Sequence, residues 1–437
     1  METQIIFTTL AMVLGYTLAQ LKKASVEISL LTATLAGALT GAIFSTPSLM
    51  AIPRHLIEGA FTYLDVILVF STATIFMAIL SESGGVAYLV QGTLKAFSHL
   101  RPLALLCLMI IVLIPGALTG AGSVSLLVVG APVALALQQL GISQKRTAAI
   151  LFIIAGLSAA APPVNIWAMI VCAGTAIPYV GFELPLGIPV LILGTLTILV
   201  LGWKKEEAQA NKDESQAFVS IPPKMRWWRV VLPFIVFFGL IAASRIWPFE
   251  LPMLGLPLEF TLAALTAWIL SPRRLNILHL SRRTMDRLLP LLATMVAVGM
   301  LQQIMTTTGI RGLLAYAVIS IPLVLLFISL AIIIPLSEGV LTYGGAAVFG
   351  IPLIWYLDSI GLHATVAIAG LSLLWPLGDG LPPTALIGRL SVMVTNYQES
   401  YWRFLRGTWF PWLVITIVGI LMVVFSSHLE FLVRWSM

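Results

Sequence analysis

The stretch from Gly370 to Leu390, GLSLLWPLGDGLPPTALIGRL, lies inside a long apolar region and yet is dense in residues that break helices. Within about ten positions it contains Pro376, Asp379 and Pro382 together with several glycines. Irregular backbone at membrane depth persists only where surrounding protein or a water-filled cavity satisfies its polar groups. The pattern therefore predicts a helix that is broken halfway across the bilayer, with its loose ends facing a polar site.

The same design occurs earlier in the chain. Residues 156–165 read GLSAAAPPVN, so both copies have Gly-Leu-Ser followed by Pro-Pro, and the Pro-Pro pairs begin at Pro162 and Pro382 (382 − 162 = 220). An Ile-Pro pair recurs at this offset, ending at Pro115 and Pro335 (335 − 115 = 220), and each pair opens a stretch rich in small residues. Paired interruptions in two halves point to a transporter's binding site. We therefore predict a secondary transporter built from two repeats.

The composition agrees with a membrane protein. Of 437 residues, 59% are hydrophobic and only 10% are charged, whereas soluble proteins carry about a quarter charged residues. Apolar runs of near-spanning length recur from end to end, which predicts an all-α polytopic membrane protein. The net charge of +6 is attributed to cytoplasmic loops rather than to nucleic-acid binding. No protease, hydrolase or phosphate-loop signature occurs, so we expect no enzyme.

The predicted order of segments is the same in the two halves, with about ten spans and two re-entrant hairpins in total. The first repeat, 1–202, has spans near 5–21, 26–45, 56–80 and 186–202, a hairpin at about 102–140 and a broken helix at about 147–174. A polar linker at 203–229 follows. The second repeat, 230–437, has spans near 230–247, 257–271, 288–306 and 409–427, a hairpin at about 320–358 and a broken helix at about 362–394. Five crossings per repeat predict an inverted topology.

The distribution of basic residues predicts the orientation. With the N-terminus outside, all but four of the 24 Lys and Arg residues fall on the predicted cytoplasmic side, and the exceptions are Arg54, Arg245, Arg311 and Arg434. This bias follows the positive-inside rule. Both termini are then predicted outside, the first hairpin enters from the cytoplasm, and the second enters from the outside. Their tips should approach each other near the midplane.

Two acidic residues fall at predicted membrane depth. Glu338 lies at the tip of the second hairpin and Asp379 inside the second break. A charge at a helix centre costs about 2.5–3.5 kcal/mol on insertion scales, so such residues carry a functional hypothesis by default. Here they would shape an ion or substrate site. The alternatives are a turn or cap role for Asp379 and a structural partner role for Glu338. An intramembrane enzyme acting on lipid-linked substrates would need the same two residues.

The small and hydroxyl-bearing residues at the interruptions are candidate ligands. Unwound backbone turns carbonyls toward a cation such as Na⁺, and half-helix N-termini present amides to an anion. This criterion nominates, for one site, Thr119, Gly120, Ser123, Ser125, Pro162, Pro163 and Asn165. Its symmetric counterpart comprises Ser337, Thr342, Gly344, Gly380, Pro382 and Thr384. The alternative is that these small residues only permit close helix packing.

Arg389 follows the second break by a few residues. Its guanidinium could bind a substrate carboxylate through two parallel hydrogen bonds. It could equally extend to the cytoplasmic surface or pair with Asp379.

The segment TGAGSVSLLVVGAPVALALQQLGISQKRTAAILFIIAGLSAAAPPVN resembles the large membrane subunit of TRAP transporters, the DctM type, and GLPPTALIGRL is similar to that family's second Pro-Pro element. The resemblance implies an elevator-type permease of the bacterial inner membrane. It implies Na⁺-driven uptake of a dicarboxylate or similar organic anion, with Na⁺ as coupling ion and no other cofactor. A periplasmic substrate-binding protein and a small four-helix membrane subunit are the implied partners.

Two features depart from that family. The hairpin tip reads TGAGSVS where a more Ser-rich sequence is usual, and WPLGDG introduces an acid into the second break. Only three spans precede the first hairpin, so we expect no fused small subunit. The alternative function is therefore a stand-alone carrier or antiporter for organic anions, coupled to Na⁺ or H⁺, on the same fold.

Overall fold

The computed structural model describes residues 2–44, 47–97, 99–203, 221–247, 250, 252, 254–382 and 384–434, and these contain helices and no strand. The helices of the first half are α1 (Glu2–Leu21), α2 (Val26–Ile43), α3 (Ile52–Phe61), α4 (Leu64–Glu82), α5 (Gly85–Phe97), α6 (Arg101–Thr119), α7 (Gly122–Ser125), α8 (Ala131–Gln139), α9 (Gln144–Ala160), α10 (Ile166–Thr175) and α11 (Glu183–Gly202). Most of the predicted linker, residues 204–220, lies outside the described residues.

The second half contains a matching series. Its helices are α12 (Trp227–Ile246), α13 (Leu256–Leu270), α14 (Ile277–Thr307), α15 (Ile310–Ser320), α16 (Leu323–Leu341), α17 (Ile351–Ser359), α18 (Ala364–Gly378), α19 (Leu386–Val394), α20 (Tyr401–Gly407), α21 (Trp409–Val424) and α22 (Phe431–Arg434). Both broken helices are present, as α9 followed by α10 and as α18 followed by α19. Both hairpins are present too, and the second limb of each contains a π-helical segment, at Leu126–Gly130 after α7 and at Ala346–Gly350 before α17.

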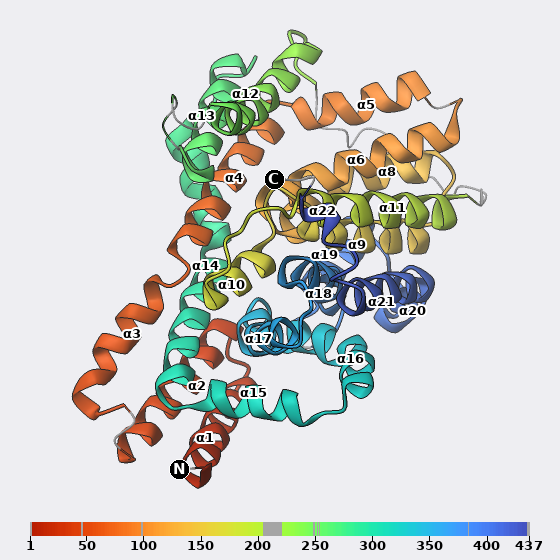
Figure 1. The fold of residues 1–437 in the computed structure, drawn as a ribbon. Coiled ribbons are helices and arrows are strands. Elements are labelled where there is room, and N and C mark those ends of the chain that lie inside the picture. The colour runs from red at the N-terminus through yellow and green to blue at the C-terminus, as the bar shows by residue number, and fades with distance from the viewer. Residues whose placement is uncertain are drawn as a thin grey trace.

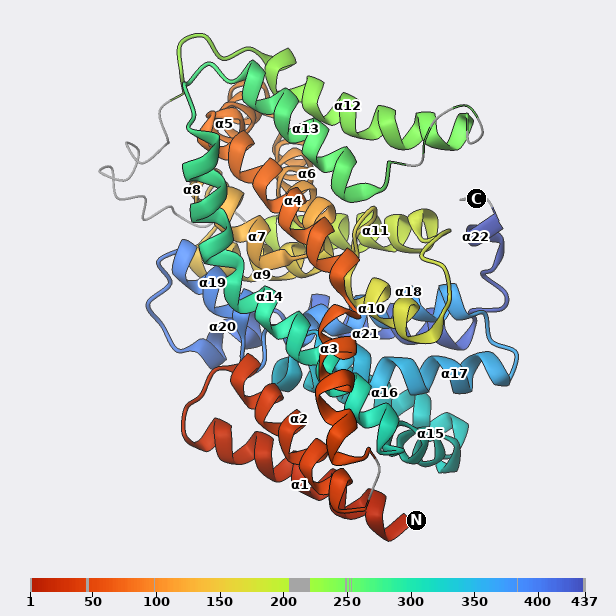
Figure 2. The ribbon, with the colours of Figure 1, turned by 90° about the vertical axis from the view of Figure 1, so that its left-hand side faces the viewer.

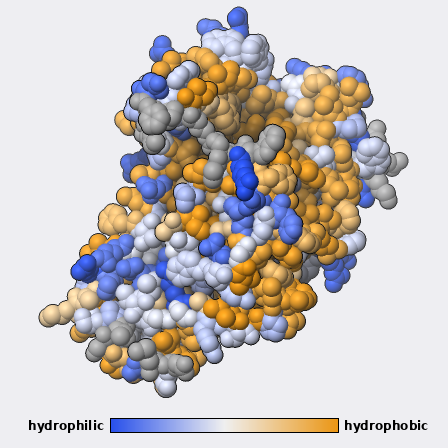
Figure 3. Space-filling view, in the orientation of Figure 1, coloured by the Kyte–Doolittle hydropathy of each residue, from blue (hydrophilic) through white to orange (hydrophobic). Residues whose placement is uncertain are grey.

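The prediction of an all-α polytopic membrane protein is confirmed. Within the described residues, nine helices are long and apolar enough to cross a membrane. A tenth is added if α20 and α21, which meet at a bend of 56°, count as one span. Large apolar side chains such as Phe7, Leu14 and Ile328 are more than half exposed, and Figure 3 shows apolar residues over much of one face of the molecule. Hydrocarbon rather than water is the solvent that suits this surface.

The helices form two layers (Figures 1 and 2). One layer consists of the long helices α4 and α14, with the pair α1–α2 at one end and the pair α12–α13 at the other. The pairings repeat: α1 packs on α2 and α2 on α14, while α12 packs on α13 and α13 on α4. The second layer holds the hairpins and the broken helices, where α6 packs on α9 and α11, and α16 packs on α18 and α21. We refer to the first layer as the scaffold.

Two predicted spans differ from the structure. The span predicted at 56–80 begins earlier and is interrupted, because α3 starts at Ile52 with Pro53 in its first turn and ends at Phe61, two residues before α4. Proline is well tolerated in a first turn, where its missing N–H would have had no partner. The span predicted at 288–306 is a helix of 31 residues that starts at Ile277, where the Asn276 side chain accepts a hydrogen bond from the His279 amide.

The scaffold depends on one very close helix crossing. A Cβ atom placed on Gly299 of α14 would lie 2.2 Å from the carbonyl oxygen of Gly59 in α3, and one on Gly59 would lie 2.8 Å from the Gly299 carbonyl oxygen. Backbone therefore meets backbone here, as it does where small residues line the interface of membrane helices. This contact joins the third helix of the first half to the third long helix of the second half.

We predict that Gly299→Ala destabilises the protein, because the added methyl group can be accommodated only if α3 and α14 move apart. Overpacking of this kind costs about 1–3 kcal/mol, measurable as a lower midpoint of thermal unfolding in detergent micelles. Gly239→Ala in α12 is the matched control, because a Cβ atom there meets nothing within 4 Å and alanine is the better helix former. Equal stability of the two variants would contradict the close crossing.

Candidate functional site

A cavity of about 700 Å³ lies between the scaffold and the hairpin layer. Both hairpin tips reach it, and so does α19 after the second break. Its polar lining residues are Gln20, Ser25, Glu27, Thr74, Ser81, Glu82, Ser123, Arg283, Thr284, Arg287, Thr294, Thr342, Thr384 and Arg389. Residues on either side of Lys22 and Lys23 in the α1–α2 turn, and Leu280 near the start of α14, also line it, and these segments are predicted to be cytoplasmic.

Most of the polar residues that line the cavity belong to the scaffold. None of these scaffold residues was predicted from the sequence to be part of the site. On α14 the lining side chains recur every three or four residues, at Arg283, Arg287, Leu291 and Thr294. One face of a helix has this spacing. On α4, Thr74, Ala78, Ser81 and Glu82 form the facing stripe. A stripe of polar residues on an otherwise apolar helix can be recognised in a sequence. Here it was missed because the span was predicted to begin at residue 288, after Arg283 and Arg287.

The cavity carries an excess of positive charge. Arg283, Arg287 and Arg389 line it, against the carboxylates Glu27 and Glu82. Arg283 and Glu82 approach to 3.9 Å with about half of each side chain exposed, so this ion pair contributes little, about 0–1 kcal/mol. The guanidinium of Arg287 on the scaffold and that of Arg389 on α19 face the same space. A net excess of positive charge in a cavity favours anionic ligands.

At the first hairpin tip most hydroxyl groups bond to backbone. Thr119 donates a hydrogen bond to the Pro115 carbonyl at 2.7 Å, and Ser125 donates to the Val112 carbonyl. Gly120 ends α6 in the left-handed conformation. Only Ser123 of the four nominated residues at this tip lines the cavity.

The first break is closed by protein groups. The Asn165 side chain accepts a hydrogen bond from the Ala168 amide at 2.9 Å and donates one to the Ala160 carbonyl at 3.0 Å, so it caps α10 and bridges the break. The Val164 amide donates to the Ala117 carbonyl of the hairpin at 3.1 Å. Pro162 and Pro163 line a different, apolar pocket of about 440 Å³ between α6, α11 and α12.

The second break is tied to its hairpin in a similar way. Both the amide and the hydroxyl group of Thr384 donate to the Gly339 carbonyl, at 3.3 Å and 2.9 Å. The Gly388 amide donates to the Asp379 carbonyl at 3.1 Å, and the Tyr401 hydroxyl group donates to the Gly380 carbonyl at 2.8 Å. Pro383, the second proline of this break, lies outside the described residues. Unlike the first break, this one reaches the cavity through Thr384.

Two carboxyl groups are buried beside the second tip. Glu338 is 1% exposed and Asp379 is 6% exposed. Oε2 of Glu338 has no hydrogen-bond partner among the described residues, and neither has the indole N–H of Trp167, although Trp167 is near enough to interact with the Glu338 carboxyl group. Glu338 and Asp379 are close enough to interact electrostatically. Ser337 beside them donates to the Ile334 carbonyl at 2.7 Å.

The nominated residues thus divide into three groups. Those that line the cavity are Ser123, Thr342, Thr384 and Arg389. Those buried at the second tip and break that do not line the cavity are Ser337, Glu338, Gly344, Asp379 and Gly380, and Pro382 of this break is exposed. Those bonded or packed away from the cavity are Thr119, Gly120, Ser125, Pro162, Pro163 and Asn165. The sequence analysis predicted two symmetric sites, whereas the structure brings both tips to one cavity, and three of the four nominated residues that line it, Thr342, Thr384 and Arg389, come from the second half.

This architecture defines a multi-pass helical membrane protein in which two hairpins and two broken helices border a central cavity, as in many secondary transporters. No protein-family model matches the sequence, and no curated protein matches it. Among solved structures, the crystal structure of the Alcanivorax borkumensis YdaH transporter is similar, with a TM-score of 0.57 over 89% of each chain at 13% sequence identity. The chain therefore has the fold of a membrane transporter. The narrower DctM-type resemblance stays a prediction.

We predict that both walls of the cavity are open to water-borne reagents. With Cys107 and Cys172 replaced by alanine, Ser81→Cys on α4 and Thr384→Cys at the second break should react with a charged maleimide in detergent. Ser372→Cys is the control, since Ser372 lies inside α18 with no exposed surface. Rapid labelling at position 372, or none at positions 81 and 384, would contradict the cavity as described.

Proposed function

We propose that this protein is a secondary active transporter that moves a carboxylate or similar organic anion across a bacterial inner membrane. The observation that carries the proposal is the cavity, where scaffold arginines and the Arg389 guanidinium face a common space beside two hairpin tips. Arginine matches a carboxylate with two parallel hydrogen bonds. The hydroxyl groups of Thr294, Thr342 and Thr384 donate to backbone carbonyl groups, so they offer acceptor oxygens rather than donors to the same space. No convergent acid, base and nucleophile set lines it, which favours transport over catalysis.

The cavity is lined by Ser81 and Glu82 at the end of α4 and by Leu280 and Arg283 near the start of α14. These are the helix ends predicted to be cytoplasmic when both termini are periplasmic. At the other end of α14, the helix that follows it, α15, contacts the hairpin layer. Arg311 of α15 donates to the Gly174 carbonyl of α10 at 3.3 Å and stacks over the Trp355 ring of α17 at 4.5 Å. We infer an inward-facing state. Transport would follow an elevator movement, in which hairpins and broken helices slide along the scaffold and carry the substrate with them.

Coupling to a cation gradient is part of the proposal. Na⁺ is the coupling ion that the DctM resemblance implies, and carbonyl and hydroxyl oxygens at the tips are ligands of the kind a hard cation takes. The resemblance also implies a small four-helix membrane subunit and a periplasmic substrate-binding protein as partners. A stand-alone carrier is the second candidate. It is favoured by the likeness of 89% of the chain to a single chain that is itself described as a transporter.

Uptake of labelled organic acids into proteoliposomes tests the substrate class. A lost charge-assisted hydrogen bond costs about 1.5–3 kcal/mol, so Arg287→Gln and Arg389→Gln should each raise the half-saturating concentration about 10- to 150-fold. Arg282→Gln is the matched control, because Arg282 adjoins Arg283 on α14 but does not line the cavity. Wild-type uptake by both cavity variants would refute anion binding there.

The same assay separates the two candidate functions. The chain is reconstituted alone, with and without a Na⁺ gradient, and then with candidate small-subunit and binding-protein partners. Uptake by the chain alone establishes a stand-alone carrier and refutes the tripartite system. Uptake that appears only when both partners are added establishes the TRAP-type assignment.

A further inference from the structure

The carboxyl groups of Glu338 and Asp379 form a buried pair that the cavity and its arginines do not account for. Glu338 comes from the end of α16 at the second hairpin tip, and Asp379 directly follows α18. A Cβ atom on Gly378 would lie 2.0 Å from the Pro335 carbonyl oxygen and 2.7 Å from Glu338 Cβ. The two segments are therefore pressed together, and their acidic side chains share one small volume.

Among the residues that the structure describes, none forms an ion pair that compensates the charge of this pair. The titratable side chain that faces both carboxyl groups is Tyr343, at the hairpin tip. Tyr401 of α20 faces Asp379 from the other side, and Arg389 in turn faces Tyr401. No described residue forms a salt bridge with either carboxyl group, and none donates a hydrogen bond to Oε2 of Glu338. Two ionised carboxylates cannot be held together in this setting without a bound cation.

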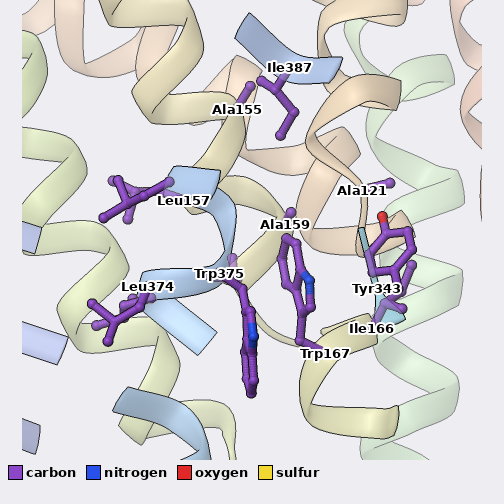
Figure 4. Packing of buried hydrophobic residues seen from close by; sticks show 14 of the residues in the cluster. Ala121, Ala155, Leu157, Ala159, Ile166, Trp167, Tyr343, Leu374, Trp375 and Ile387 are labelled. Carbon is purple, nitrogen blue, oxygen red and sulfur yellow. The ribbon is translucent and has the colours of Figure 1, made fainter. Parts of the chain in front are cut away.

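Trp167 links this pair to the first repeat. It is the second residue of α10, after the first break, and its ring lies 5.4 Å from that of Tyr343 between centroids. Figure 4 shows the two side chains next to each other, although they come from opposite halves of the chain. The indole nitrogen of Trp167 is only a donor, and it faces Glu338. A donor N–H at this position disfavours a metal ion, because a metal ion needs several oxygen ligands. The same N–H is compatible with a carboxyl pair that is protonated or carries a single negative charge.

The fold itself does not require these acids. At the repeat offset of 220, the first half has Leu118 in place of Glu338 and Ala159 in place of Asp379. Both are buried, with 2% and 0% of their surface exposed. The same hairpin-to-broken-helix packing therefore forms with apolar side chains. Unpaired buried acids that packing does not need are expected to have a function.

We propose that Glu338 and Asp379 together bind one exchangeable proton inside the hairpin layer. The proton lies on one carboxyl group and is shared with the other, which leaves the pair with a single negative charge beside Tyr343 and the Trp167 N–H. The role of this proton in transport, as a coupling ion carried with the hairpin layer, rests on the proposed function. The binding of the proton does not, so the two can be tested separately.

Infrared spectroscopy of the purified protein in detergent at neutral pH tests the binding directly. A protonated carboxyl group has a C=O stretching band that a carboxylate lacks, and it shifts in heavy water. We expect such a band in the wild-type protein, lost in Glu338→Gln and in Asp379→Asn. Glu399→Gln is the matched control, because Glu399 is exposed and paired with Arg403 at 3.3 Å. Glu338→Leu, which copies the residue of the first repeat, should lose the band while the protein stays folded.

Addition of Na⁺ in exchange for choline, at constant pH and ionic strength, distinguishes the two cations. A band that Na⁺ does not change supports the proton site. Loss of the band on addition of Na⁺ overturns the proposal and assigns the pair to Na⁺. The proposal is also overturned if no band is present, or if the band survives in both variants.

The coupling role is tested in proteoliposomes with a pH gradient and no Na⁺, with a panel of labelled organic acids. We expect uptake by the wild-type protein and by Glu399→Gln, and loss of its dependence on the pH gradient in Glu338→Gln. Absence of uptake under pH and Na⁺ gradients alike, with and without the candidate partners, combined with a wild-type infrared band refutes the proposed function and leaves the proton site intact. Transport by the wild-type protein that ignores the pH gradient refutes the coupling role.

Discussion

The structure depends on one constraint, which is that backbone amide and carbonyl groups inside a membrane must find partners within the protein. Each broken helix exposes such groups halfway across, and each is paired by the hairpin of the same repeat. The Val164 amide bonds to the Ala117 carbonyl in the first half, and Thr384 bonds to the Gly339 carbonyl in the second. Each break therefore depends on the hairpin of its own repeat for hydrogen-bond partners. This explains why the Pro-Pro and Ile-Pro signals recur in the sequence with a common offset.

The two repeats share a backbone design but differ in chemistry. In the first, side chains complete the fold: Asn165 caps α10, and Thr119 and Ser125 bond to carbonyls of their own hairpin. In the second, Thr384 and Arg389 reach the central cavity, and two acids take the places of leucine and alanine. When only one of two repeats carries the specialised side chains, a single site at the centre of the molecule is expected. The cavity, bordered by both tips, agrees with that arrangement.

Most of the fold could be predicted from the sequence because the signals are local. Apolar runs locate the spans, and Gly and Pro locate the interruptions, so both hairpins and both broken helices agree with the structure within a few residues. The break between α3 and α4 was not predicted, since Thr62 and Tyr63 carry no helix-breaking signature. The site was harder to predict. Its scaffold wall is set by which helix face meets the hairpins, as at Arg287 of α14, and that contact depends on the close approach of Gly59 and Gly299.

The ties between hairpins and broken helices limit how the protein can open. A hairpin that swung away alone would leave the amide of Val164 or Thr384 without its partner. An unsatisfied buried group costs about 1–3 kcal/mol, which confines the detached form to roughly one molecule in five down to one in 150. Such leaks would be brief and rare. The hydrogen bonds that satisfy the backbone of the broken helices therefore also hold the hairpins closed around the cavity. A substitution that weakens one of these hydrogen bonds should make the membrane more permeable.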